Sequence, residues 1–207
     1  MIPDRPILVV GAGGHAKVVV ATLRACGLAI DFVVDDDPAK QGREWLGLRV
    51  QAPASHLQGR SAVLAIGDNR LRAQFARRCE TTTWISAVHP QAYVDPSATI
   101  GPGSLVFAGA IVQPGARVGR HVIVNTGATI DHDCSVDDFV HVCPGVHLAG
   151  AVHVGEGTLL GIGSVAKPGV SIGAWCTVGA GAAVVTDLGE HCTALGVPAK
   201  PADPKRG

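Results

Sequence analysis

Residues 94–117 read VDPSAT, IGPGSL, VFAGAI and VQPGAR, four consecutive hexapeptides that each begin with a bulky aliphatic residue. The pattern continues to residue 189, and fifteen of the sixteen first positions from Val94 to Val184 are Val, Ile or Leu. A period of six excludes an amphipathic helix, whose apolar stripe recurs about every 3.6 residues. It is typical of a parallel β-helix, in which three short strands form one coil of about eighteen residues. The stretch therefore predicts roughly five stacked coils.

The composition fits a narrow apolar column. Hydrophobic residues make up 47% of the 207 residues but aromatic residues only 4%, so small aliphatic side chains must form the core. Lys plus Arg and Asp plus Glu both number 17, and without a basic run nucleic acid is excluded as the main partner. No leader-like start or apolar span of membrane length is visible, so we expect a cytoplasmic protein without membrane contact. The six cysteines form no C-x-x-C pair and are expected to be small buried hydrophobes.

The first 86 residues follow a different pattern, which predicts a separate α/β domain. Residues 7–10 (ILVV) predict a buried strand that leads into the glycine-rich turn GAGGHA, and residues 18–26 predict a helix. Residues 31–34 and 62–66 predict two further strands, the second followed by a helix that ends at Arg78. Strand, glycine-rich turn, helix and strand in this order indicate a Rossmann-like unit.

The turn of this unit suggests a phosphate site. It reads G-x-G-x-x-A and opens a helix, where free N–H groups and the helix dipole attract phosphate. Asp35 lies 24 residues after Gly11, near the usual spacing for an acid that binds a ribose or base hydroxyl. The unit has room for only one mononucleotide half, which favours a single nucleotide carrying another group. Two alternatives remain open. The glycine-rich turn could serve only to pack the strand against the helix, and His15 could be a solvated side chain that binds no ligand.

Positions eighteen residues apart should stack along one edge of the β-helix. One such column reads Pro96, Pro114, His132, Gly150 and Pro168. His132 is flanked by Asp131 and Asp133, and a carboxylate that accepts one ring proton prepares the other nitrogen as a general base. Gly150 is expected to leave open space above His132 for an acceptor. An exposed histidine between two solvated acids is the alternative.

A second column reads Ala108, Thr126, Pro144, Ile162 and Ala180, uncharged and mostly small. Such an edge could receive a long thin ligand or form an ordinary subunit contact. His141, His147 and His153 suggest a zinc site, but a step of six moves one face around the triangle, so these three side chains should point in different directions. We therefore expect no metal. Cys134 lies in the inward column, so it is expected to be buried and unreactive.

Taken together, these motifs resemble one family. They are Gly11-Ala12-Gly13-Gly14-His15, Val34-Asp35-Asp36, Ala65-Ile66-Gly67, Val88-His89-Pro90, Asn125-Thr126, Asp131-His132-Asp133-Cys134, Phe139-Val140-His141-Val142 and Gly196-Val197-Pro198-Ala199-Lys200. The chain is similar, over essentially its whole length, to the hexapeptide sugar acetyltransferases of the sialic acid O-acetyltransferase type, which include the nucleotide-sugar N-acetyltransferases of bacillosamine and perosamine synthesis.

The resemblance implies a Rossmann-like nucleotide-sugar-binding domain (1–86), then a left-handed parallel β-helix that binds acetyl-CoA (87–207). It also implies a homotrimer with active sites between protomers. In the implied roles, Gly13, Gly14, His15, Asp35, Asp36 and Gly67 hold the nucleotide sugar, His132 is the base with support from Asp133, and His141, Ile162 and Ala180 contact acetyl-CoA. Family members often have Glu at the position of Asp133, which has a longer reach.

The reaction implied is direct attack of a sugar amine on the thioester of acetyl-CoA, with His132 as the base and a backbone N–H or His141 at the oxyanion. Acetylation of a sugar hydroxyl is the nearest alternative. A trimer that binds a nucleotide sugar without catalysis is the second. The sequence does not separate these readings, nor does it identify the nucleobase, the sugar or the longest acyl chain accepted.

Overall fold

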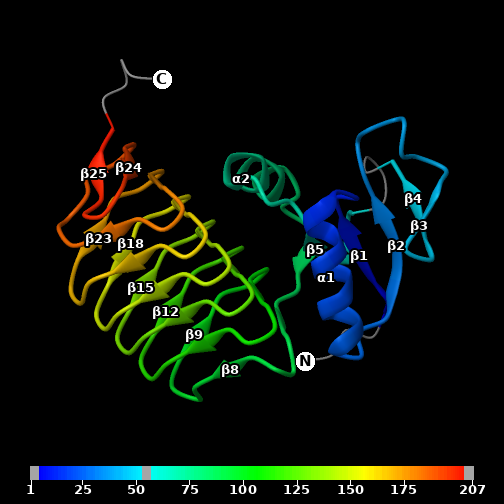
Figure 1. The fold of residues 1–207 in the computed structure, drawn as a ribbon. Coiled ribbons are helices and arrows are strands. Elements are labelled where there is room, and N and C mark those ends of the chain that lie inside the picture. The colour runs from blue at the N-terminus through cyan, green and yellow to red at the C-terminus, as the bar shows by residue number, and fades with distance from the viewer. Residues whose placement is uncertain (1–4, 53–56, 203–207) are drawn as a thin grey trace.

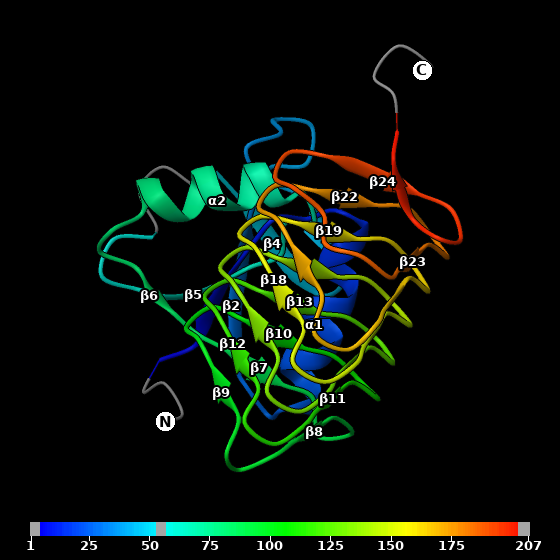
Figure 2. The ribbon, with the colours of Figure 1, turned by 90° about the vertical axis from the view of Figure 1, so that its left-hand side faces the viewer.

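The computed structural model describes residues 5–52 and 57–202, which form an α/β domain followed by a tapering triangular column (Figure 1). The α/β domain lies beside the column, and in the view from the left-hand side of Figure 1 the column lies in front of that domain (Figure 2). The predicted architecture, a Rossmann-like domain followed by a parallel β-helix, is confirmed. None of the helices in the described ranges is long and apolar enough to cross a membrane.

The α/β domain has a six-stranded sheet in the order β3-β4-β2-β1-β5-β6, parallel except for β3. Its elements are β1 (Ile7–Val10), α1 (Gly14–Ala25), β2 (Ile30–Val34), β3 (Glu44–Trp45), β4 (Leu48–Gln51), β5 (Ser61–Leu64), α2 (Asn69–Arg78) and β6 (Thr83–Trp84). All four residues of β1 are buried because both faces of the sheet are covered. Ile7 and Val9 pack toward α1, and Leu8 and Val10 pack toward the side of Phe75 in α2.

Three parallel sheets form the faces of the column, which we number in chain order. The first face contains β7 (Ala87–Val88), β10 (Leu105–Val106), β13 (Ile123–Val124), β16 (His141–Val142), β19 (Leu159–Leu160), β22 (Thr177–Val178), β24 (Thr193–Leu195) and β25 (Lys200–Pro201). The second contains β8 (Tyr93–Val94), β11 (Ile111–Val112), β14 (Thr129–Ile130), β17 (His147–Leu148), β20 (Val165–Ala166) and β23 (Ala183–Val184). The third contains β9 (Thr99–Ile100), β12 (Arg117–Val118), β15 (Ser135–Val136), β18 (His153–Val154) and β21 (Ser171–Ile172).

The sixfold rhythm sets the register of the stack. Each strand pairs with the strand eighteen residues later, as Ile111 does with Thr129, so the bulky column of the hexapeptides fills the interior. Cys134 is buried there as predicted. The regular stack ends where the rhythm fails: β24 pairs with β22 at an offset of sixteen residues. Strand β25 then folds back antiparallel on β24.

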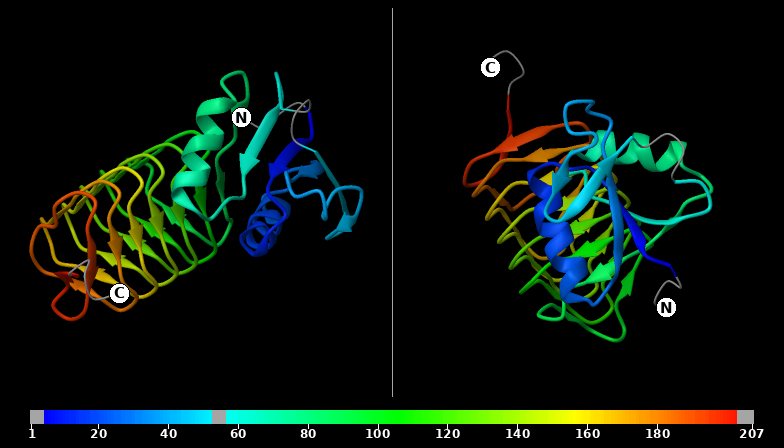
Figure 3. Two further views of the ribbon diagram at one scale, coloured as in Figure 1. Left: turned by 90° about the horizontal axis from the view of Figure 1, so that it is seen from above. Right: turned by 90° about the vertical axis from the view of Figure 1, so that its right-hand side faces the viewer.

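The two parts share a core at the first face. Helix α1 packs between the sheet and the column, where Leu105, Phe107 and Ile123 join its apolar cluster. Seen from above, α2 lies beside the column at the side that faces the α/β domain (Figure 3). The first face is therefore covered by the α/β domain.

Two details of the sequence prediction are corrected. Helix α1 begins at Gly14, four residues before the predicted start, because the second half of the glycine-rich turn already forms the first helical turn. The β3–β4 hairpin and β6 were not predicted, since strands of two to four residues carry too little periodicity to be recognised. The predicted boundary after residue 86 falls between β6 and β7.

Two buried histidines and the half-buried His15 should make stability sensitive to acid. Burial lowers the pKa of His15, His121 and His141 from 6.5 to about 4 in each case. The unfolded chain therefore binds more protons between these values. Above pH 6.5 these groups do not reduce the free energy of unfolding. As the pH falls from 6.5 to about 4 the free energy of unfolding decreases, and below about 4 these groups cause no further decrease.

Replacing His121 with Phe should reduce the slope of the free energy of unfolding against pH between about 4 and 6.5. The reduction corresponds to at most one proton, or about 1.4 kcal/mol per pH unit. Within the described residues neither ring nitrogen of His121 has a hydrogen-bond partner, and the ring stacks on Phe139. The backbone tolerates an aromatic residue here, because Phe139 and Trp175 occupy the same repeat position with φ of 60° and 55°. Urea unfolding at pH 7 and pH 5 measures the effect. An unchanged difference between the two pH values would contradict it.

Candidate active site

The glycine-rich turn leaves the start of α1 open. Gly13 is the N-cap of α1 and provides no side-chain cap, whereas Asp68 caps α2 by accepting from the N–H of Leu71 at 2.8 Å. A Cβ built at Gly13 or Gly14 would meet nothing within 4 Å. The first N–H groups of α1 therefore face free space, which is the geometry of an anion site.

This space belongs to a pocket of about 410 Å³ at the carboxyl ends of β1, β2 and β5. All six predicted nucleotide-sugar residues line it, namely Gly13, Gly14, His15, Asp35, Asp36 and Gly67. The sequence reasoning did not assign Lys40, Leu71, Phe75 and Arg78, which complete the wall with two cations and two apolar side chains. Three of these come from α2, whose placement over the pocket is decided by the tertiary structure alone.

The two adjacent aspartates differ in their environment. Asp35 accepts from the N–H groups of Ala12 (2.7 Å) and Asp37 (3.0 Å) and from Nζ of Lys40 (3.0 Å). Burial raises the pKa of Asp35, but these donors outweigh it and hold the pKa below its ordinary value. The exposed carboxylate of Asp36 has no hydrogen bond within residues 5–52 and 57–202. The carboxylate of Asp36 is therefore available to a ligand, whereas the carboxylate of Asp35 stabilises the glycine-rich turn.

His15 and His141 meet where the pocket touches the first face. Their ring centroids lie 5.9 Å apart, and Phe107 lies 5.6 Å from His15. Asn125 accepts the N–H of Thr126 through Oδ1 (2.8 Å), so its Nδ2 donates to Nε2 of His141 (3.0 Å). The proton of His141 is then on Nδ1, which donates to the carbonyl oxygen of Gly67 (3.3 Å). His141 is therefore a neutral ring with both nitrogens engaged.

His132 lies at the corner between the second and third faces, exposed to solvent. Its Nδ1 lies 2.9 Å from Oδ2 of Asp133, and the side chain is 61% exposed. The hydrogen bond to Asp133 raises the pKa of His132 above its ordinary value. With the proton on Nδ1, Nε2 is free to accept a proton from a substrate. The aspartate side chain is therefore long enough to reach the imidazole ring.

The prediction for Gly150 was wrong in detail. A Cβ at this position would collide with Nε2 and Cε1 of His132, so the ring itself fills the space that the missing side chain leaves. The glycine is needed to accommodate the imidazole, and the acceptor must approach from outside the corner.

The predicted acetyl-CoA edge lies at the corner between the first and second faces. Ile162 and Ala180 stack there on successive coils, and the N–H of Gly181 donates to the carbonyl of Ile162 at 2.8 Å. Ile162 is 62% exposed, which is unusual for a large aliphatic side chain in this chain. The two residues share an edge, as predicted.

One chain does not bring all these groups together. The pocket and His141 lie at the first face, whereas His132 lies at the corner opposite that face. The three histidines considered for zinc lie on β16, β17 and β18, each on a different face. In the described ranges, no three His, Cys, Asp or Glu side chains are grouped so that they could hold a metal ion.

Comparisons with known proteins point to one family. Residues 6–79 match the family model of the PglD N-terminal domain. Perosamine N-acetyltransferase from Caulobacter crescentus, solved with CoA and GDP-perosamine, is 39% identical, with 98% of this chain and 99% of that chain covered and a TM-score of 0.91. The acetyltransferase domain of PglB from Neisseria gonorrhoeae is 39% identical and has a TM-score of 0.90. The match covers 96% of this chain and 100% of that domain.

The chain belongs to this family of hexapeptide sugar N-acetyltransferases. The PglB domain has also been solved with acetyl coenzyme A. WeeI from Acinetobacter baumannii, at 21% identity and a TM-score of 0.72, shares the fold of this chain. A comparison with curated protein sequences gave no match.

Proposed function

We propose that this acetyltransferase moves the acetyl group of acetyl-CoA to the amino group of a nucleotide-linked 4-amino-4,6-dideoxy sugar. The proposal is carried by one observation: the chain aligns end to end with an enzyme that was solved with CoA and GDP-perosamine. The open start of α1 and the pocket beside it suit the diphosphate and nucleoside of such a substrate.

The residues divide into three groups by position. Gly13, Gly14 and Asp36 line the part of the pocket suited to the nucleotide, with His15 and Gly67 at its inner end. Ile162 and Ala180 form the edge for the pantetheine arm of acetyl-CoA. His132 with Asp133 supplies the base.

The active site is completed by a neighbouring copy. His132 and the pocket lie on different sides of one column, so they can face the same substrate only if they come from two protomers. A cyclic homotrimer places three identical corners against three neighbouring pockets and closes the assembly. Each active site would then lie between two protomers.

The chemistry is a direct transfer. The sugar amine attacks the thioester carbonyl, and Nε2 of His132 accepts the proton that the nitrogen loses. The C–S bond then breaks, and the CoA thiolate leaves and takes up a proton. A main-chain N–H at the corner is the better oxyanion donor, because both nitrogens of His141 are already bonded. Asp133 stabilises the imidazolium that forms on His132.

A panel of UDP-, GDP- and dTDP-linked 4-amino sugars tests the proposal, with thiol release from acetyl-CoA as the measurement. Release with an amino sugar and none with the matching 4-hydroxy sugar supports N-acetylation. Release only with hydroxyl acceptors would favour the O-acetyltransferase alternative. Binding of nucleotide sugars without any thiol release would favour the non-catalytic trimer.

Replacing Gly13 with Asp should abolish nucleotide-sugar binding while the fold is kept. The carboxylate would enter the space before α1 and repel phosphate there. The added Cβ would meet no atom within 4 Å, and Asp is a better N-cap than Gly by a few tenths of a kcal/mol. Calorimetry with GDP and UDP sugars, together with thermal melting, measures both effects. Gly13→Asn is the matched control, similar in size without the charge. Unchanged affinity in Gly13→Asp would exclude this turn as the phosphate site.

A further inference from the structure

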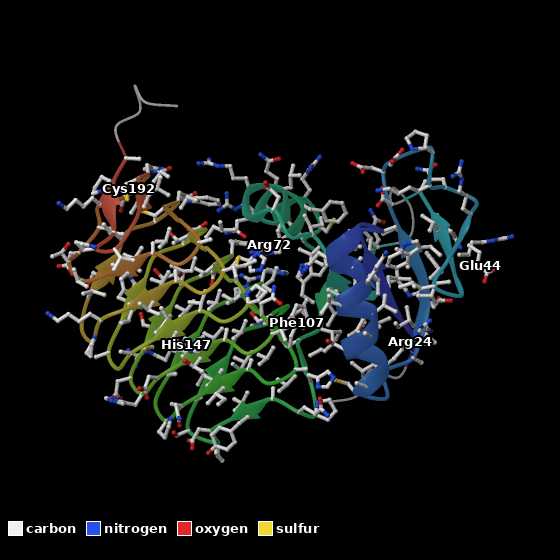
Figure 4. The ribbon with its side chains drawn as sticks, in the orientation of Figure 1. Arg24, Glu44, Arg72, Phe107, His147 and Cys192 are labelled. Atoms are coloured by element: carbon white, nitrogen blue, oxygen red, sulfur yellow. The ribbon has the colours of Figure 1, made fainter. Side chains whose placement is uncertain are left out.

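Arg72 of α2 is a buried cation without a carboxylate partner in the described part of the chain. It is 1% exposed and lies between the column and the α/β domain (Figure 4). Burial lowers its pKa to about 10, so it stays charged at neutral pH. Such burial costs free energy unless every N–H is satisfied. Here the guanidinium is satisfied by oxygen atoms on both parts of the chain.

On one side, Arg72 binds the column at a repeated position. Its Nε donates to the carbonyl of His121 (2.9 Å) and its Nη2 to that of Phe139 (2.8 Å). Nη2 also donates to Oδ1 of Asn69 (2.8 Å), whose Nδ2 donates to the carbonyl of Gly157 (3.0 Å). Residues 121, 139 and 157 are eighteen apart, so the first turn of α2 holds three successive coils at one corner.

On the other side, Arg72 holds the floor of the nucleotide-sugar pocket. Its Nη1 donates to the carbonyls of Ile66 (3.0 Å) and Gly67 (3.1 Å). The carbonyl of Gly67 also accepts from Nδ1 of His141. One planar group thus links the pocket loop, α2 and the coil that carries His141.

We propose that Arg72 is a positioning residue for acetyl transfer, which fixes the Ile66–Gly67 peptide against the coil of His141 and so sets where the bound sugar lies relative to the acetyl donor. This inference rests on the proposed function. Arg72 does not line the pocket, so it acts through the peptide it holds. Lysine cannot replace it, because a single ammonium does not reach both sets of carbonyls in fixed directions.

Steady-state kinetics of Arg72→Met tests the role. We expect kcat to fall by about 10²-fold, as displacements near 1 Å can cause, while KM for acetyl-CoA changes little because its edge lies at another corner. Arg72→Lys should recover only part of the loss. Arg70→Met is the matched control: Arg70 lies in the same helix, exposed, 5.1 Å above the ring of Trp175. A wild-type kcat in Arg72→Met or in Arg72→Lys, or an equal loss in Arg70→Met, would overturn the proposal.

A second measurement separates this inference from the proposed function. In the wild type, ¹⁵N shifts of His141 should report a proton on Nδ1. In the Arg72 variants the Ile66–Gly67 peptide is no longer held, so the hydrogen bond from Nδ1 of His141 to the Gly67 carbonyl should change. We expect the Nδ1 signal to move, while Asn125 keeps the proton on Nδ1. If Arg72→Met does not fold, Arg72→Lys carries the same test. An unchanged His141 signal in a folded variant contradicts the positioning role even if no acceptor sugar is found. A changed signal without acetyl transfer in the wild type would count against the proposed function only.

Discussion

Replacing His132 with Ala is expected to lower kcat by about 10²- to 10⁴-fold, the usual contribution of a positioned general base. The side chain is exposed, so little packing is lost and stability should hardly change. The hydrogen bond of its Nδ1 to Asp133 raises the pKa of the ring and fixes the ring orientation. Initial rates with saturating acetyl-CoA and amino sugar measure the loss, and circular dichroism checks the fold.

His153→Ala is the matched control for this result. His153 is also a half-exposed histidine of the column, with its Nε2 3.6 Å from Oδ2 of Asp137 and its Nδ1 bonded to Ser135. It lies within strand β18 of the third face and not at the corner that carries His132. Full activity in His132→Ala, or an equal loss in His153→Ala, would remove His132 from the role of base.

Mixing two inactive variants should restore activity. One variant carries His132→Ala and keeps its pocket, and the other carries Gly13→Asp and keeps its base. If each active site takes its pocket from one protomer and His132 from the next, any mixed trimer has one intact site of three, about a third of wild-type activity. Co-expression with two different tags and purification on both isolates the mixed trimers for the assay.

The same experiment has a clear opposite outcome. If pocket and base came from one protomer, each protomer in the mixture would lack one of them, and mixed assemblies would be as inactive as the parents. A mass measurement by light scattering is needed alongside, because a monomer or a dimer would also contradict the proposed assembly.

The column could be predicted in detail because the position of each of its residues follows from a short repeat in the sequence. Every hexapeptide repeats the same contacts, so one spacing rule places Ile162 beneath Ala180 and Cys134 inside. The six pocket residues were named from the resemblance to the family. They line one pocket because the glycine-rich turn and the ends of parallel strands meet at one sheet edge. The error at Gly150 arose because spacing shows where a side chain is missing but not what fills the gap.

The sequence by itself determined the coil register, the open turn at α1 and the histidine with its neighbouring carboxylate at a corner, since each depends on residues a fixed distance apart along the chain. Only the tertiary structure decided that the α/β domain covers the first face, that Arg72 is buried there against three coils, and that His132 lies on the far side from its own pocket. The physical reason is that docking depends on contacts between segments about 50 to 90 residues apart, which no periodic pattern records.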